Sequence, residues 1–160
     1  MKEDLTTQQE RQAIYEKVAK RAAENLNKRG IYARFVPDRK EALSVVMDMI
    51  PEGHSVGTAD SATLLQVGII SALRKRGKNE ILNPFMRDEK GHLLIDGEER
   101  KELMRKVLLT DVYVIGTNAV TMDGKLVNVD GNGNRVAAMA VMKITTTTPI
   151  QVAGSRVEVS

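Results

Sequence analysis

The fold is decided by the stretch DVYVIGTNAVTMDGKLVNVDGNGNR, residues 111–135. Within its first six residues, Asp111–Gly116, the run Val-Tyr-Val-Ile is apolar and mostly β-branched, which predicts a central strand of a parallel sheet, buried on both faces. Two turn dipeptides, Asp123-Gly124 and Asp130-Gly131, lie on either side of Leu126–Val129. That arrangement predicts that Leu126–Val129 is one half of a tight hairpin. Arg135 is then expected to begin a helix.

The segments upstream of this stretch follow an order of strand, loop and helix. Ser55–Gly57 predicts a brief strand, and small polar residues lead from it into a helix expected from about Ala62 to Arg76. A second helix, Glu98–Leu109, precedes the strand at 111–116. This order is typical of an α/β fold. We expect three layers, with a mostly parallel sheet flanked by helices and a small β-hairpin near the binding loop.

The rest of the chain contributes further elements. We expect helices over Thr7–Arg29, Arg39–Met49 and Val136–Met142, and strands over Ile31–Val36 and Glu80–Leu82. Ile144–Val159 has high β-propensity without a clear pairing pattern. No internal repeat or linker is visible, so residues 1–160 are expected to form a single domain.

Composition excludes several classes of protein. The chain is 42% hydrophobic and 28% charged, as in ordinary globular domains. It has no cysteine, which excludes a disulfide, a cysteine nucleophile and an iron–sulfur cluster held by cysteine within this chain. We therefore expect no cofactor within this chain, and no metal site, because neither His54 nor His92 has a companion at metal-ligand spacing. The few aromatic residues argue against nucleic-acid binding. No apolar run approaches a membrane span, so a cytoplasmic protein is expected.

Two polar, glycine-containing loops form the candidate ligand-binding site. The first follows the strand at 55–57 and contributes Gly57, Thr58, Asp60 and Ser61. The second contributes Asn118, Asn128, Asp130, Gly131, Gly133, Asn134 and Arg135. Because the carboxyl ends of parallel strands share one edge of a sheet, both loops are expected to face one crevice. Backbone N–H groups at a helix start and the Arg135 guanidinium would bind a carboxylate or a phosphate there.

Simpler explanations stay open for the same residues. The second loop can be a complicated turn in which Arg135 pairs with Asp130 or Asp123. In the first loop, Asp60 or Ser61 can be a helix N-cap with no role in ligand binding.

Some fifteen positions over about twenty residues carry a family resemblance. They are Asn118-Ala119, Thr121, Asp123-Gly124, Leu126-Val127-Asn128, Asp130-Gly131 and Gly133-Asn134-Arg135-Val136-Ala137. In type and spacing they closely resemble the signature of the LUD domain, which is found in lactate-utilization proteins. Weaker similarity through Gly57, Asp60-Ser61 and Thr63-Leu64 extends the resemblance to about Thr7–Ala138. The chain departs from the family at Ala59, where glycine is frequent, and after Ala138, where it is divergent or shortened.

The resemblance implies the fold of glucosamine-6-phosphate deaminase, ribose-5-phosphate isomerase and CoA transferases. It also implies that the chain binds a small carboxylate or phosphorylated metabolite in support of lactate-to-pyruvate oxidation, with iron–sulfur subunits as partners. One alternative is a stand-alone isomerase or CoA-transferase with Asp60 or Asp123 as general base. Another is a non-catalytic ligand-sensing or structural subunit. The sequence leaves open whether the chain is an enzyme and whether it forms a homo-oligomer.

Overall fold

The computed structural model describes residues 5–141, which divide into two compact units. The hairpin unit comprises the described residues 5–42 and 117–127. The sheet unit comprises the described residues 43–116 and 128–141. Met142 and the β-prone segment Ile144–Val159 lie outside the described residues, so the expectations for them remain predictions.

The sheet unit is built on three parallel strands, β1 (Val56–Thr58), β2 (Ile81–Leu82) and β3 (Val112–Val114). Their order is β2-β1-β3, and Val56 of β1 pairs with Ile81 on one side and Val112 on the other. The parallel sheet confirms the α/β class. The prediction that residues 111–116 form the central strand is wrong for the described sheet, because β1 is central and fully buried while β3 is only partly buried.

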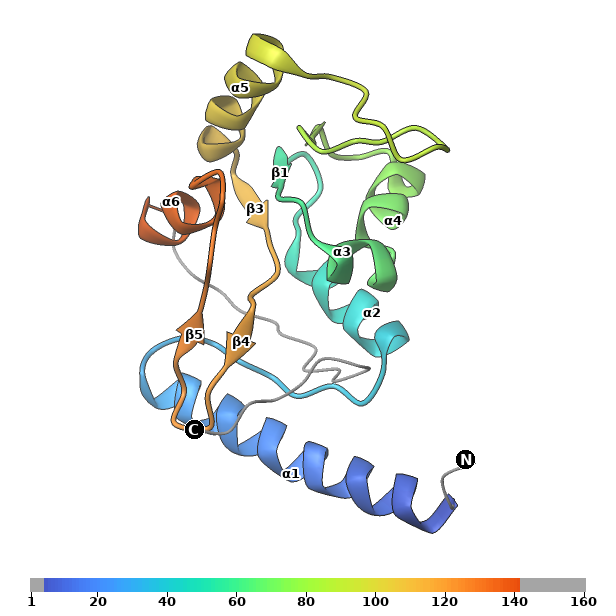
Figure 1. Ribbon diagram of the computed structural model, residues 1–160, viewed down its shortest axis with the longest axis vertical. Helices are drawn as coiled ribbons and strands as arrows, with labels where there is room; N and C mark the ends of the chain where they lie inside the picture. The colour runs from blue at the N-terminus through green and yellow to red at the C-terminus, as the bar shows by residue number, and fades with distance from the viewer. Residues whose placement is uncertain (1–4, 142–160) are drawn as a thin grey trace. The chain divides into compact units, whose positions relative to one another are not determined.

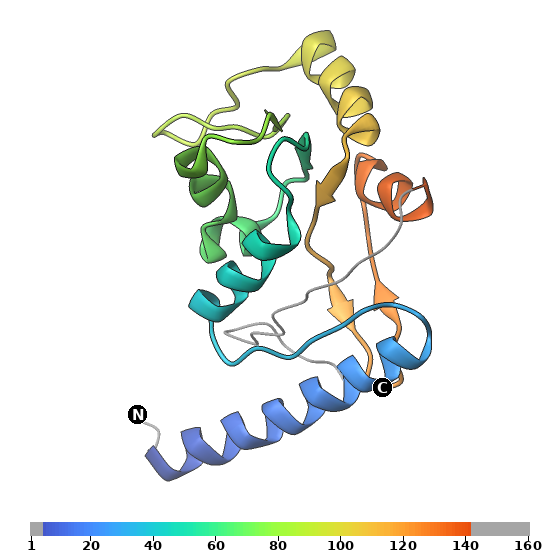
Figure 2. The same ribbon diagram turned by 180° about the vertical axis from the view of Figure 1, so that it is seen from behind.

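Helices flank this sheet on both sides (Figures 1 and 2). On one side lie α3 (Ala62–Val67) and α4 (Ile69–Arg76). On the other side lie α5 (Gly97–Lys106), which continues into the short 3-10 helix η1 (Val107–Leu109), and α6 (Asn134–Val141). The helix α2 (Arg39–Met49) is divided between the units, and its residues from Leu43 onward belong to the sheet unit. The sheet between helical layers agrees with the expected architecture.

The helix expected over Ala62–Arg76 is interrupted at Gly68. This glycine has φ +82°, in the left-handed region, and its N–H donates to the carbonyl oxygens of Leu64 and Leu65, both at 3.1 Å. A left-handed residue of this kind ends a helix, because it closes the last turn on itself instead of continuing the ladder. The apolar spacing continues across the break, so periodicity alone did not reveal it.

The hairpin unit joins a long helix, α1 (Leu5–Lys28), to a two-stranded antiparallel hairpin. The hairpin strands are β4 (Ala119–Val120) and β5 (Leu126–Val127), with Ala119 opposite Val127. This confirms the tight hairpin predicted around Asp123-Gly124. The apolar core of the unit consists of the buried residues Ala23, Leu26 and Ala33. Three partly buried residues pack against it: Ile31, Val120 and Leu126.

The strand expected over Ile31–Val36 is absent, apart from a single bridge residue at Tyr32. The amide side chain of Asn27 explains part of this difference. Asn27 Oδ1 accepts the N–H of Ala33 at 3.1 Å, and Asn27 Nδ2 donates to the Ala33 carbonyl at 2.7 Å. A side chain thus satisfies both backbone groups that a neighbouring strand would have bonded.

Within residues 5–141, none of the helices combines the length and the apolar composition that a membrane crossing requires.

Candidate functional site

The carboxyl ends of β1 and β3 bring two chain segments to one edge of the sheet. Thr58 is paired with Val114, and the N–H of Ala59 donates to the Val114 carbonyl at 3.3 Å, so the pairing extends past the strand end. A Cβ added at Gly116 would lie 2.6 Å from Ser61 Oγ. The loop that follows β1 and the residues that follow β3 therefore leave the same edge in contact.

Gly57 is a packing residue within the sheet. A Cβ at this position would lie 2.7 Å from Thr110 Oγ1, 2.8 Å from Tyr113 Cδ2 and 2.8 Å from the Val107 carbonyl oxygen. Such distances are too short for real contacts, so only glycine lets η1 and Tyr113 approach the central strand this closely. The lack of a side chain at Gly57 is thus explained by the chain's own packing.

The three other residues predicted in the first loop have different surroundings. Thr58 is completely buried, and its Oγ1 has no hydrogen-bond partner within the described part of the chain. Ser61 occupies the N-cap position of α3 with extended backbone angles but makes no side-chain cap bond. The half-exposed Asp60 forms an ion pair with Arg87, at 3.0 Å between Oδ2 and Nη2.

The second loop is organised around the carboxylate of Asp130. Asp130 Oδ1 accepts the N–H of Asn132 at 3.1 Å, and Oδ2 accepts those of Arg135 at 2.7 Å and Val136 at 3.1 Å. Partial burial alone would raise the pKa of Asp130, but the donated N–H bonds outweigh it and hold the pKa below its usual value. Asp130 therefore occupies the amides at the start of α6 that were expected to bind an external anion.

Asn134 and Asn128 tie this loop to the rest of the sheet unit. The buried Asn134 donates from Nδ2 to the Tyr113 hydroxyl at 2.9 Å, and Asn128 Nδ2 donates to Met139 Sδ at 3.2 Å. Burial raises the pKa of Tyr113, so its phenol stays protonated at neutral pH. Gly133 has φ +77°, as expected of a left-handed turn position. Gly131 does not have a positive φ, and a Cβ added there would have no atom within 4 Å.

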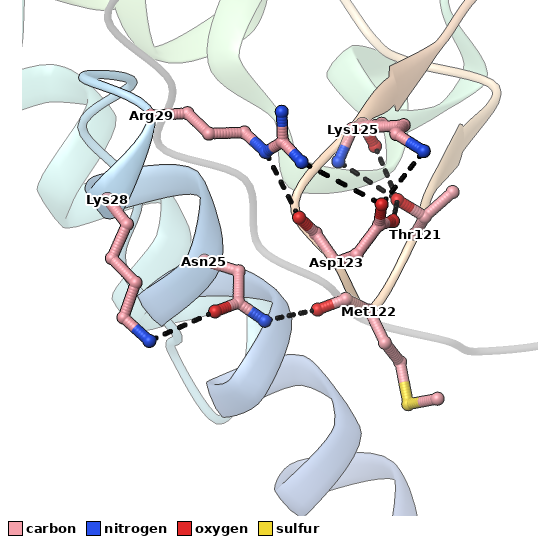
Figure 3. Close-up of polar contacts among 7 residues, drawn as sticks. All are labelled: Asn25, Lys28, Arg29, Thr121, Met122, Asp123 and Lys125. Atoms are coloured by element: carbon pink, nitrogen blue, oxygen red, sulfur yellow. Dashed lines mark hydrogen bonds and ion pairs between the residues drawn. The ribbon is translucent and has the colours of Figure 1, made fainter.

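Asn118 and Asp123 belong to the hairpin unit, whereas the other predicted site residues belong to the sheet unit. Figure 3 shows Asp123 at the tip of the hairpin, where its carboxylate contacts Lys125 Nζ at 2.8 Å, the Thr121 hydroxyl, and Arg29 Nη2 at 3.8 Å. The bonds from Lys125 and Thr121 lower the pKa of Asp123 to about 2. A carboxylate with so low a pKa is a weak general base at neutral pH.

Side chains of α1 and of the residue after it also donate to backbone carbonyls at the tip of the hairpin (Figure 3). Asn25 Nδ2 donates to the Met122 carbonyl at 2.7 Å, and Arg29 Nε donates to the Asp123 carbonyl at 3.1 Å. Gly124 has φ +81°, and a Cβ there would lie 2.5 Å from the carbonyl carbon of Asn25. The Asp123-Gly124 turn is therefore shaped for contact with the helix.

Sequence reasoning missed Arg87 at the sheet edge and did not predict the contact between Gly116 and Ser61. Gly116 directly follows a predicted strand, and that position is a usable signal of close approach. Arg87 lies in a polar excursion 27 residues from Asp60, and no motif links the two residues. Among residues 5–141, no cluster of three or more His, Cys, Asp or Glu side chains is placed to hold a metal ion.

Comparison with known proteins identifies the chain by family. The family model of the LUD domain matches residues 19–146. The matched range includes both candidate loops. A search of curated proteins and a search of solved structures each returned no match.

Proposed function

The chain belongs to the LUD domain family, and on this premise we propose that it binds a small carboxylate or phosphorylated metabolite in support of the oxidation of lactate to pyruvate. The family match supports a relation to lactate utilization. The match runs through both compact units, which also supports treating residues 1–160 as one functional domain.

One observation carries the binding proposal. The loop after β1 and the residues after β3 leave the same edge of a parallel sheet, with Gly116 in contact with Ser61. Open α/β sheets bind ligands outside the carboxyl ends of their strands, where loops from different strands meet. The buried Thr58 hydroxyl at the end of the central strand adds a polar group that lacks a partner in the described chain.

The surroundings of the two candidate bases favour binding over catalysis. Asp123 is held as a carboxylate by its low pKa, and Asp60 is already paired with Arg87. An isomerase or acyl-transfer mechanism needs a base whose pKa lies nearer the working pH. The stand-alone enzyme is therefore the weaker alternative.

The proposal assigns the redox chemistry to partner subunits. These 160 residues contain no cysteine, so an iron–sulfur cluster held by cysteine would have to be bound outside this sequence. In this proposal the chain works in the cytoplasm, presenting a bound metabolite to iron–sulfur lactate-oxidation subunits. A non-catalytic sensing role would use the same site without the transfer of electrons.

A thermal-shift screen tests the proposal. L-lactate, pyruvate, inorganic phosphate and a sugar phosphate are titrated against the wild-type protein and Arg135→Ala. A ligand at one hundred times its Kd stabilises the folded state by about 2.7 kcal/mol. We expect a concentration-dependent rise in Tm with at least one compound. We expect that the isolated chain turns over none of them. A wild-type Tm that no compound changes would overturn the binding function, and turnover by the isolated chain would favour the enzyme.

Loss of the shift in Arg135→Ala would identify Arg135 as part of the site. An equal shift in both proteins would exclude Arg135 as the main anchor while leaving the binding function intact.

A further inference from the structure

Arg87 is held at the sheet edge by a well-bonded turn. Arg87 and Leu93 form an antiparallel bridge, and the Asp88 carboxylate accepts the N–H groups of Lys90 at 2.9 Å and His92 at 2.8 Å. Arg87 Nη1 donates to the Gly91 carbonyl at 3.1 Å, inside the same turn. One side of the guanidinium is thus fixed by the chain, while Nη2 extends to Asp60.

Asp60 is the partner of Arg87, and the fold makes little other use of it. Ser61 holds the N-cap position of α3, and the side chain of Asp60 is 50% exposed while that of Arg87 is 44% exposed. Ion pairs this open to water contribute little to stability, because solvent screens them and the two side chains lose conformational freedom. The pair can therefore be exchanged for another guanidinium–carboxylate pair at small cost.

Thr58 adds a second polar group, two residues before Asp60 at the end of the central strand. Side chains alternate along a strand, so Thr58 projects from the face opposite to the one on which Gly57 packs. The Thr58 hydroxyl is fully buried and has no partner among the described residues. Because buried polar groups are nearly always hydrogen-bonded, this hydroxyl is free to bond with a group from outside the described residues.

We propose that Arg87 is the residue that binds the carboxylate of the ligand, and that Asp60 occupies its guanidinium until a ligand displaces it. This inference rests on the proposed binding function and names its anchor and its ligand class, a small monocarboxylate. The guanidinium is planar and can donate two parallel bonds to one carboxylate, whereas Asp60 accepts from Nη2 alone in the described contact. An incoming carboxylate gains the second bond that Asp60 does not make.

The test compares the Kd values of L-lactate, pyruvate and inorganic phosphate for four variants by isothermal titration. Arg87→Gln is expected to weaken carboxylate binding about tenfold or more, because a charged bidentate contact is lost. Arg87→Lys keeps the charge without the planar fork and is expected to fall between the wild type and Arg87→Gln. Asp60→Asn is expected to strengthen binding, since it removes the competing anion.

Arg74→Gln is the matched control, because it removes the same charge from the same unit at a side chain whose described hydrogen bond goes to Met86. Equal Kd values for Arg87→Gln and Arg74→Gln would overturn the assignment of Arg87 while leaving the binding function standing. Weaker binding by Asp60→Asn would overturn the displacement step. Arg87-dependent binding of phosphate alone would overturn the carboxylate assignment. A wild-type protein that binds none of the three probes would refute the proposed function itself.

Discussion

Replacement of Gly57 by alanine tests whether this glycine serves the packing of the sheet or the approach of a ligand. The added Cβ would lie 2.7–2.8 Å from Thr110 Oγ1, Tyr113 Cδ2 and the Val107 carbonyl oxygen. None of these atoms can move away freely. Thr110 Oγ1 donates to the Val107 carbonyl at 2.7 Å, and the Tyr113 hydroxyl accepts a bond from Asn134. Overpacking of this kind costs roughly 1–3 kcal/mol, so Gly57→Ala is expected to lose about that much free energy of unfolding.

Equilibrium unfolding in urea measures the loss, with Gly131→Ala as the matched control. Gly131 belongs to the same unit, has no atom within 4 Å of an added Cβ and does not have a positive φ. Its replacement is expected to leave the urea midpoint unchanged or slightly raised, because alanine restricts the unfolded chain. Equal midpoints for Gly57→Ala and Gly131→Ala would refute the packing argument. Unchanged stability together with lost anion binding would instead place Gly57 in direct contact with the ligand.

Two further predictions concern the hairpin unit. Gly124→Ala combines a left-handed backbone with a clash against the Asn25 backbone, so it should lower the free energy of unfolding by about 2–5 kcal/mol. The control Gly30→Ala has φ +79° and open space around the added Cβ, so backbone strain alone should lower the free energy of unfolding by about 1–2 kcal/mol. Equal urea midpoints for the two variants would show that the hairpin tip does not pack on α1. The pKa of Asp123 lies at about 2 in the folded protein, below the usual 3.8, so its stabilising contribution is present above pH 4 and is lost as the pH falls towards 2. Urea midpoints measured between pH 6 and pH 2 should therefore fall more steeply in the wild type than in Asp123→Asn, and parallel curves would contradict the assignment.

The position of Asp130 changes how the second loop is understood. Glycine and asparagine at residues 131–134 were expected to direct free amides at an external anion. In the structure the chain supplies that anion itself, since Asp130 accepts the N–H groups of Arg135 and Val136. An internal carboxylate at a helix start satisfies the same donors and the same dipole as a ligand would. Ligand contact is consequently expected at the first loop, where Asp60 pairs with Arg87 from a different segment of the chain.

The sequence by itself determined the features that depend on neighbouring residues. The Asp123-Gly124 dipeptide predicted the hairpin of β4 and β5, and the small-residue loop before Ala62 predicted a strand-to-helix connection in a parallel sheet. The residues between 118 and 137 also indicated the family from sequence alone, and the range that the family model matches includes all of them. Turn chemistry, side-chain periodicity and motif spacing act over a few residues, so a local pattern is sufficient to reveal them.

Tertiary structure alone decided which strand is central and which partners the polar side chains take. A β-branched run such as residues 112–114 identifies a strand, but its place in the sheet depends on segments more than 25 residues away. The role of Gly57 depends on η1 and Tyr113, and the pairing of Asp60 depends on a turn that carries no motif. These contacts join residues distant in sequence, and their geometry is fixed only when the helices and the sheet pack together.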